Sequence, residues 1–361
     1  NNLNKIPIRI HVNGSRGKSS VVRLIASGLR FGGLKTFAKT TGTSPRIIDE
    51  NGDDKYIHRL RTASIGEQIS LIRYFSKMKP DVLVIECMAV NPQYQWISEQ
   101  KIVRSTIGVL TNVRPDHLDE MGMSMNQITK SMGNTIPFNG VMVTSEEKKT
   151  DILNDISNLR GTKFYTADIK VNDNDLVDFS YLEHKENVSL ALKVCELCGV
   201  DKKQALKGMI SCKPDPGALT IWEIKLKNNL FKFINAFAAN DPSSTLKTWE
   251  MINNNFHPTK FAIFLNTRID RQYRTVQLIN LIFNQLKPNV LVLRGENFPK
   301  ELDGLMNQNK NIKVYKFPYS IKQEELIKFM GKDLNDFIVL GIGNIVGWGE
   351  KLMKKLKEFK I

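Results

Sequence analysis

Apolar and polar positions follow two different periods along most of this chain. Short apolar runs such as Val82–Ile85 have the length of buried strands, whereas Lys18–Phe31 repeats its apolar residues at helical spacing. Strands and helices that alternate in this way are typical of a mostly parallel sheet covered on both faces. The pattern therefore predicts an α/β fold.

The regular pattern stops around Lys213–Gly217, where two prolines and a glycine prevent a helix from continuing. We therefore predict two domains, residues 1–216 and residues 217–361. In the first we expect strands at Ile6–Val12, Leu34–Lys39, Val82–Glu86, Ser105–Leu110 and Gly140–Thr144, and helices at Lys18–Phe31 and Glu67–Met78. In the second we expect strands at Leu219–Leu226, Leu230–Phe237 and Phe261–Leu265 and near Val290 and Phe337, and helices after Pro242 and Asp270 and at the C-terminus.

A glycine loop joins the first predicted strand to the first predicted helix. Gly14 and Gly17 allow a tight turn whose N–H groups point at an anion, and the helix adds the positive end of its dipole. Lys18 can then bridge the outer phosphates of a nucleotide, and the Ser19 hydroxyl can hold Mg²⁺. Because Val12 replaces the first glycine of the full motif, the loop has a shorter form; the alternative is a chance glycine-rich turn. The expected nucleotide-binding residues are Gly14, Ser15, Arg16, Gly17, Lys18, Ser19 and Ser20.

Polar residues end two further predicted strands at the same sheet edge. Glu86 directly follows the run V-L-V-I, and such a carboxylate suits a metal ion, although a surface glutamate is the alternative. Thr111–Asp119 (T-N-V-R-P-D-H-L-D) follows the next strand. Its side chains offer hard ligands and one imidazole, which suit a second divalent ion or an anionic substrate group. The residues concerned are Asn112, Asp116, His117 and Asp119.

Composition limits the classes of molecule that this chain is expected to bind. The formal net charge of +15 attracts polyanions, but no recognisable nucleic-acid reader module occurs, so we expect no nucleic-acid partner. No apolar run is long enough to span a bilayer, and the start without methionine indicates an N-terminally trimmed chain. Cys195 and Cys198 lack further zinc ligands nearby, so the four cysteines are expected to be buried free thiols.

These motifs together resemble those of a known family. The G-S-R-G-K-S loop, Glu86 and N-V-R-P-D-H-L-D resemble the central ATPase domain of the Mur ligase superfamily, which also includes folylpolyglutamate synthase and cyanophycin synthetase. The strings V-I-E-C-M-A-V-N-P-Q-Y-Q, A-A-N-D-P-S-S-T and G-I-G-N-I-V-G-W-G-E resemble more closely the PgsB/CapB family of poly-γ-glutamate synthase subunits. The resemblance implies a P-loop ATPase domain with a mostly parallel sheet, followed by a smaller Rossmann-like α/β domain.

The resemblance also implies an ATP-dependent amide ligase. ATP would phosphorylate a carboxylate, an amine would attack the acyl phosphate, and ADP and phosphate would leave. Lys18, Glu86 and His117 match the catalytic positions, and Ser19, Glu86 and His117 match those that bind Mg²⁺, with Mn²⁺ as a substitute. Asn187 and Asp241 match further nucleotide-binding positions, and Lys130 is the nearest candidate for the carbamoylated lysine of Mur ligases.

Substrate contacts are expected from two regions. Thr41–Arg46 resembles a loop near the substrate in folylpolyglutamate synthases, and arginines that follow a strand in the second domain suit a bidentate grip on carboxylate or phosphate. A solvated basic face is the alternative for these arginines. The predicted substrate-binding residues are Thr43, Arg46, Asn112, Arg114, Arg268, Asp270 and Arg271.

The resemblance finally implies partners and a location. The substrates would be glutamate and γ-linked polyglutamate, in capsule biosynthesis, and the partners small membrane-embedded subunits at the cytoplasmic face; a homo-oligomer is left open. The terminal helix, with Leu352, Leu356 and Phe359 on one face, either contacts lipid or a membrane subunit or packs into the core. Rival functions are a folylpolyglutamate-type ligase and a non-catalytic nucleotide-binding scaffold subunit.

Overall fold

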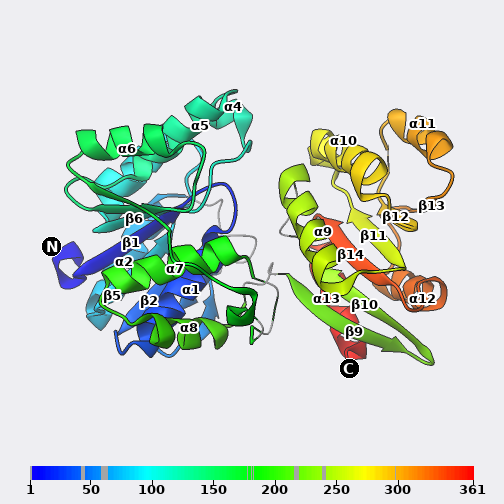
Figure 1. Ribbon diagram of the computed structural model, residues 1–361, viewed down its shortest axis with the longest axis horizontal. Helices are drawn as coiled ribbons and strands as arrows, with labels where there is room; N and C mark the ends of the chain where they lie inside the picture. Colours follow the sequence, from blue (N-terminus) through cyan, green and yellow to red (C-terminus); the bar gives the residue numbers. More distant parts are fainter. Residues whose placement is uncertain are drawn as a thin grey trace. The chain divides into compact units, whose positions relative to one another are not determined.

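The chain divides into two compact units, Asn1–Pro216 and Gly217–Ile361, which a computed structural model shows in Figure 1. The structure describes residues 2–41, 45–57, 64–176, 178–179, 181, 183–214, 219–237, 241–296 and 298–361. Each unit is built on its own mixed, mostly parallel sheet with helices against it. The predicted α/β fold class is confirmed.

In its described part, the first unit has an eight-stranded sheet in the order β4-β3-β2-β5-β1-β6-β7-β8. Its central strand β1 pairs in parallel with β5 and β6, so the loop that follows β1 lies between the ends of two neighbouring strands. The strands are β1 (Ile8–Asn13), β2 (Thr36–Thr40), β3 (Arg46–Ile48), β4 (Asp54–Tyr56), β5 (Val82–Glu86), β6 (Ile107–Leu110), β7 (Val141–Thr144) and β8 (Lys163–Thr166). The helices are α1 (Lys18–Phe31), α2 (Gly66–Met78), α3 (Pro92–Ile97), α4 (Leu118–Met121), α5 (Met125–Met132), α6 (Thr150–Leu159), α7 (Lys185–Leu197) and α8 (Lys202–Ile210).

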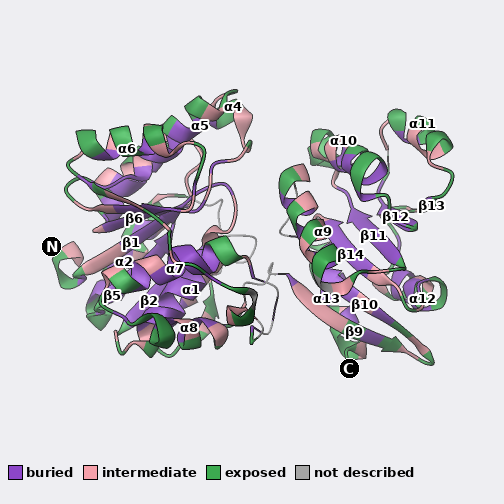
Figure 2. Cartoon of the chain, in the orientation of Figure 1, coloured by how far each residue is buried: buried purple, intermediate pink, exposed green. Residues whose placement is uncertain are grey.

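Side chains at alternate positions of the first sheet point to opposite faces and pack against different helices. Phe37, Leu83 and Ile85 pack with Ile72 and Phe75 of α2. Helices α1, α7 and α8 contact one another and cover the first sheet as well. Because both faces are covered, the central strands are almost entirely buried (Figure 2).

The second unit has a six-stranded sheet in its described part, in the order β13-β12-β11-β14-β10-β9, with β9 and β10 antiparallel and the other pairs parallel. Its strands are β9 (Thr220–Leu226), β10 (Asn229–Asn235), β11 (Phe261–Asn266), β12 (Val290–Arg294), β13 (Lys313–Phe317) and β14 (Ile338–Gly343). Its helices are α9 (Pro242–Phe256), α10 (Gln272–Leu281), α11 (Glu301–Gln308), α12 (Gln323–Asp333) and α13 (Trp348–Leu356).

The terminal helix α13 contributes to the core of the second unit. Leu352 and Leu356 are fully buried and pack with Phe231, Phe264 and Val339, while Phe359 packs against the same cluster. Of the two roles considered for this helix, core packing is confirmed. None of the described helices is long and apolar enough to cross a membrane.

The cysteines are free thiols, as predicted. Cys87, Cys195 and Cys212 are buried, whereas Cys198 at the end of α7 is partly exposed, which corrects the expectation for that residue. Burial raises the pKa of both Cys198 and Cys212 to about 11, so these thiols stay protonated and unreactive at neutral pH.

Candidate functional site

The turn between β1 and α1 requires glycine at two positions. Gly14 and Gly17 have φ angles of 134° and 82°, which side-chain-bearing residues rarely adopt. A Cβ atom on Gly14 would lie 2.0 Å from the Thr111 hydroxyl, and one on Gly17 would lie 2.8 Å from Oδ1 of Asn187. Gly17 also caps α1 without a side chain, so the first-turn N–H groups of α1 stay available to an anion.

The segment after β6 holds this phosphate loop in shape. Asn112 accepts from the Arg16 N–H at 3.2 Å and donates through Nδ2 to the Arg16 carbonyl at 3.0 Å, and the Thr111 hydroxyl donates to the same carbonyl. The Ser15 hydroxyl donates to the Arg114 carbonyl at 3.0 Å and accepts from the Arg114 N–H at 2.8 Å. Asn112 and the Arg114 backbone thus position the loop, and their predicted substrate contacts stay predictions.

Three predicted side chains converge at the start of α1. The Lys18 ammonium donates to the carbonyl of Gly14 at 2.6 Å, so it lies over its own loop. The Ser19 hydroxyl donates to Oε2 of Glu86 at 2.8 Å, and the Thr41 N–H donates to the same oxygen at 2.7 Å. Glu86 is only 2% exposed at the end of β5, so its carboxylate is held in a fixed orientation towards Ser19.

The paired oxygens of Ser19 and Glu86 fit a magnesium ion. Mg²⁺ prefers hard oxygen ligands and takes one or two from the protein, with water and phosphate oxygens completing the shell. Because Ser19 and Glu86 supply only two oxygens, the donor set suits an ion bound together with a nucleotide.

His117 lies in a more open environment. It adopts a left-handed conformation with φ of 46° at the residue just before α4, and its side chain is 38% exposed. Its Nε2 lies 3.9 Å from Oδ1 of Asp116, whose other oxygen lies 3.6 Å from Nη2 of Arg16. This chain of contacts brings His117 to the edge of the phosphate loop, and its role as a metal ligand stays a prediction.

Asn187 packs behind the phosphate loop. Its Nδ2 donates to Oε1 of the buried Glu183 at 2.8 Å, and its Oδ1 lies beside Gly17. The His184 N–H donates to the same Glu183 oxygen at 2.9 Å, so Glu183 organises the first turn of α7. Ser20 is partly exposed in the first turn of α1, and Lys130 is exposed on α5.

Arg46 lies on β3, in a short hairpin with β4 that the apolar pattern does not predict. Its guanidinium lies 5.2 Å from the centre of the Tyr56 ring. The hairpin is tied to α1 by Arg23, whose Nη1 and Nη2 donate to the two carboxylate oxygens of Asp54 at 3.0 and 2.6 Å. Thr43, the other substrate-binding residue predicted here, lies outside the described residues.

The residues predicted in the second unit lie on two elements. Arg268 donates from Nε and Nη2 to both oxygens of Asp270 at 2.8 and 2.6 Å, which lowers the pKa of that carboxyl group. Arg271 is exposed on the same short turn, with its Nε 4.0 Å from Asp270. Asp241 caps α9 by accepting from the Ser244 N–H at 2.9 Å.

Sequence reasoning missed two buried polar groups near these sites. The carboxylate of Glu146 accepts from the Val113 N–H at 2.8 Å and supports the segment that holds the phosphate loop. In the second unit the buried Arg294 donates to Asn266 at 2.9 Å and lies 4.0 Å from the centre of the Trp348 ring. Arg294 ends β12 as Glu86 ends β5, and Glu146 follows β7 by two residues, so the signal that identified Glu86, applied to every strand, would have found both.

Two family models match this chain. Residues 12–207 match the Mur ligase middle domain, and residues 221–359 match the poly-gamma-glutamate synthase CapB C-terminal domain. The first model covers the phosphate loop, Glu86 and His117 in a single match. The fold and these motifs therefore define a Mur ligase.

Two curated relatives identify the family within the Mur ligases to which the chain belongs. It is 36% identical to PGA synthase CapB of Bacillus subtilis over 100% of this chain and 93% of the relative. It is also 36% identical to the capsule biosynthesis protein CapB of Bacillus anthracis, over 99% of this chain and 78% of the relative. The chain therefore belongs to the CapB family of poly-γ-glutamate synthases within the Mur ligases, and it is an ATP-dependent amide ligase.

Solved structures share the fold at low sequence identity. Escherichia coli FolC in complex with DHPP and ADP has a TM-score of 0.71 at 14% identity and covers 99% of this chain and 91% of its own. Folylpolyglutamate synthase from Thermotoga maritima has a TM-score of 0.68 at 14% identity, covering 98% and 89%. The bifunctional synthase from Yersinia pestis complexed with AMPPNP and Mn ion has a TM-score of 0.69 at 14% identity, covering 98% and 90%.

Proposed function

We propose that this ligase forms γ-glutamyl amide bonds in poly-γ-glutamate through an acyl-phosphate intermediate and releases ADP and phosphate. The observation that carries the proposal is the Ser19–Glu86 pair beside Lys18 and the phosphate loop. Both named relatives are CapB proteins, and one name states a PGA synthase. A cradle with a cation and two oxygen donors is the arrangement that phosphoryl transfer requires.

The loop residues would position the nucleotide. The N–H groups at the start of α1 would bind the phosphates, and Lys18 would leave the Gly14 carbonyl to contact the outer ones. Ser19 and Glu86 would hold Mg²⁺, which neutralises charge on the phosphates when it is bound. Ser15, Arg16 and Ser20 would support the same loop, and Asn187 and Asp241 would contact the nucleotide.

The acceptor carboxylate and the attacking amine both belong to acidic substrates. Glutamate and γ-linked polyglutamate are anionic, so arginines are suited to bind them bidentately. We propose Arg46 and Arg114 in the first unit and Arg268 and Arg271 in the second for this role. Asp270, which holds the Arg268 fork, would orient that arginine.

We also propose that the chain works at the cytoplasmic face of the membrane with small membrane-embedded subunits. The CapB relatives and the net charge of +15, which favours anionic surfaces, support this location. A folylpolyglutamate-type activity is the second candidate, because three matching folds are those of FolC-type enzymes.

Release of ADP from Mg-ATP tests the proposed function. The purified chain is assayed with and without glutamate or short γ-glutamyl oligomers, and products are analysed for new amide bonds by mass spectrometry. Acidic substrate should stimulate ADP release, and Lys18→Ala should abolish the stimulation. Lys163→Ala is the matched control, because Lys163 is exposed and begins β8, at the sheet edge opposite the one where the phosphate loop lies.

The outcomes separate the candidate functions. Stimulation by a pteridine substrate but not by γ-glutamyl oligomers would favour the folylpolyglutamate-type ligase. Tight ATP binding without stimulation by any acidic substrate, even with the membrane subunits added, would favour a scaffold subunit.

A further inference from the structure

A buried glutamine on α3 joins the end of the central strand β1 to segments outside the first sheet. Gln95 is only 1% exposed, and its Oε1 accepts from Nδ2 of Asn13 at 3.0 Å. Its Nε2 donates to the Val90 carbonyl at 2.6 Å and to the Ser131 hydroxyl at 3.2 Å, and the Met121 sulfur lies 3.6 Å from the same nitrogen. One amide therefore connects β1 with α4, α5 and the segment that follows β5.

Strand register already relates the phosphate loop to Glu86. The pairing of β1 with β5 places Val12 opposite Glu86, so the backbone of the sheet sets this distance. His117 lies outside the sheet, in the segment that leads from β6 to α4. Its position relative to the phosphate loop therefore depends on the side-chain contacts of that segment and not on register alone.

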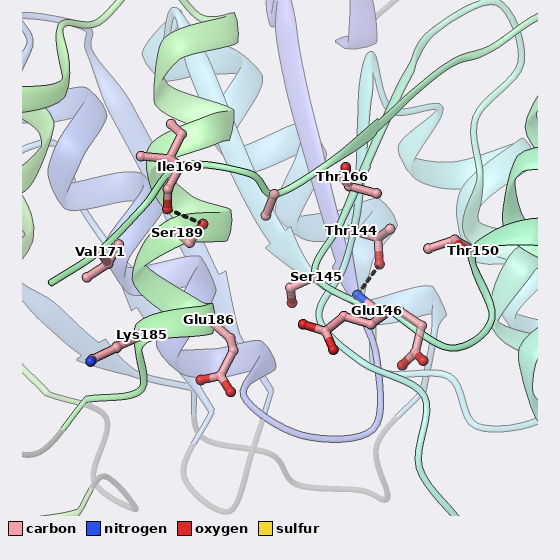
Figure 3. Close-up of a pocket in the computed structure, with 12 residues that line it drawn as sticks. Thr144, Ser145, Glu146, Thr150, Thr166, Ile169, Val171, Lys185, Glu186 and Ser189 are labelled. Carbon is pink, nitrogen blue, oxygen red and sulfur yellow. Dashed lines mark hydrogen bonds between the residues drawn. The ribbon is translucent and has the colours of Figure 1, made fainter.

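A carboxylate holds this segment just ahead of His117. Glu146 is buried and accepts from the Val113 N–H at 2.8 Å. Figure 3 shows Glu146 after β7, on the wall of a cavity, with its own N–H donating to the Thr144 hydroxyl at 3.0 Å. The end of β7 therefore fixes the first part of the segment.

The α3 helix holds the same segment just after His117. The N–H of Met121 donates to the His117 carbonyl at 2.9 Å, so the single turn of α4 carries His117 at its start. Gln95 lies against the Met121 sulfur. At the start of α3, Nδ2 of Asn91 donates to Oε2 of Glu120 at 3.2 Å. A shift of Gln95 would therefore move α4 and His117 with it.

We infer that Gln95 is a positioning residue, which sets the distance between His117 and the phosphate loop through Asn13 and Met121. The inference rests on the proposed function, because it presupposes a role for His117 in the reaction. Asn13 ends the central strand, so it is a fixed reference point for the loop that follows it. Hydrogen bonds to an amide are directional, and a misplacement of about 1 Å at a reacting group can cost on the order of 10²-fold in rate.

Substrate-stimulated ADP release tests the inference. Gln95→Met keeps a side chain of similar length but removes the amide, and it should lower kcat by about ten- to a hundredfold while the KM for ATP stays within about twofold. Gln100→Met is the matched control. The amide of Gln100, just after α3, donates to the carbonyls of Asn134 and Ile136 at 3.4 and 3.0 Å, so its loss should leave kcat unchanged.

A double-mutant cycle separates positioning of His117 from general packing. If Gln95 acts through His117, Gln95→Met should change kcat by less than about twofold in a His117→Ala background. Independent losses that multiply would overturn the inference, as would an unchanged kcat in Gln95→Met alone.

A milder variant covers the case in which Gln95→Met does not fold. Ser131→Ala removes one partner of the Gln95 amide and should lower kcat by about two- to tenfold, the worth of one neutral hydrogen bond. An unchanged kcat in this variant would then overturn the inference.

Histidine-selective NMR gives a readout that needs neither metal nor nucleotide. The ring signals of His117 should shift in Gln95→Met and stay in place in Gln100→Met, with the other four histidines as internal references. Unchanged His117 signals in Gln95→Met would overturn the inference. Failure of the unmodified chain to release ADP with any acidic substrate would instead contradict the proposed function, and the NMR comparison would still decide the role of Gln95.

Discussion

The Ser19 hydroxyl donates to Oε2 of Glu86 across 2.8 Å, although 67 residues separate the two in the chain. Ser19 lies in α1, which follows the central strand β1, and Glu86 ends β5, which pairs with β1. The register places Glu86 opposite Val12, at the entrance to the phosphate loop. The parallel sheet thus brings together the hydroxyl and the carboxylate that we propose as ligands of one metal ion.

Glu86→Gln should lower the rate of substrate-stimulated ADP release on the order of 10²–10³-fold, the usual cost of one electrostatic contact to the transferred group. The buried amide keeps the hydrogen bonds with Ser19 and Thr41 but loses the charge that we propose to hold Mg²⁺. Steady-state kinetics over a range of Mg²⁺ concentrations measures this. Glu301→Gln, an exposed glutamate on α11, is the control, and equal rates in the two variants would exclude a catalytic role for Glu86.

Gly17→Ala should destabilise the fold and also weaken ADP binding. The left-handed conformation costs an L-residue roughly 1–2 kcal/mol, and the new Cβ would meet Asn187 at 2.8 Å. Gly33→Ala is the matched control, because Gly33 has a φ of 89° but nothing within 4 Å of its added Cβ. Thermal unfolding should show a loss in both variants, and calorimetry a loss of ADP affinity in Gly17→Ala alone. Equal ADP affinities would show that the contact with Asn187 does not shape the loop.

Asp54→Asn should lower the free energy of unfolding by about 3–5 kcal/mol, because it leaves the buried Arg23 guanidinium without its carboxylate. Asp53→Asn is the neighbouring control. The Asp53 carboxylate is 63% exposed and pairs with Lys213, so its loss should cost only about 0–1 kcal/mol. Urea unfolding measures both, and similar losses would contradict a special role for the buried pair.

His11 should make the fold less stable in alkali. Burial disfavours the imidazolium, but Cys87 and Glu99 together raise the pKa of His11 from 6.5 to about 10. The folded state therefore binds the extra proton between these values, and its contribution to stability is complete below pH 6.5 and disappears as the pH rises through about 10.

Urea unfolding of the unmodified chain and of His11→Gln between pH 6.5 and 9.5 tests this, with the range taken from the two pKa values. The stability difference between the two should shrink as the pH rises. His257→Gln, at the end of α9, is the control and should show a constant difference from the unmodified chain. A constant difference for His11→Gln as well would mean that His11 is neutral in the folded state.

Arg46→Ala should raise the KM for acidic substrate more than the KM for ATP. The guanidinium is held over Tyr56 on the β3–β4 hairpin, where it can face an anionic acceptor. Steady-state kinetics with each substrate varied in turn gives both constants. Arg73→Ala, on the exposed side of α2, serves as control, and equal effects on the two KM values would remove Arg46 from the acceptor site.

The sequence alone determined the fold class and the elements with a strong local signal. Lys18–Phe31 and Val82–Glu86 lie where the pattern predicts them, because helical and strand periodicity are properties of neighbouring residues. The glycine loop was equally visible, since its backbone angles demand glycine at Gly14 and Gly17. The short β3–β4 hairpin was not, because three-residue strands carry too little periodicity.

Only the tertiary structure decided which polar groups meet. Asn112 is predicted to contact substrate, and only the structure shows that both polar ends of its amide also bind the Arg16 backbone. Nothing in the local pattern around His11 predicts the buried pair that it forms with Glu99 at 2.7 Å. The physical reason is that a residue's type sets which hydrogen bonds it can form, whereas strand order and register set which partner lies within reach.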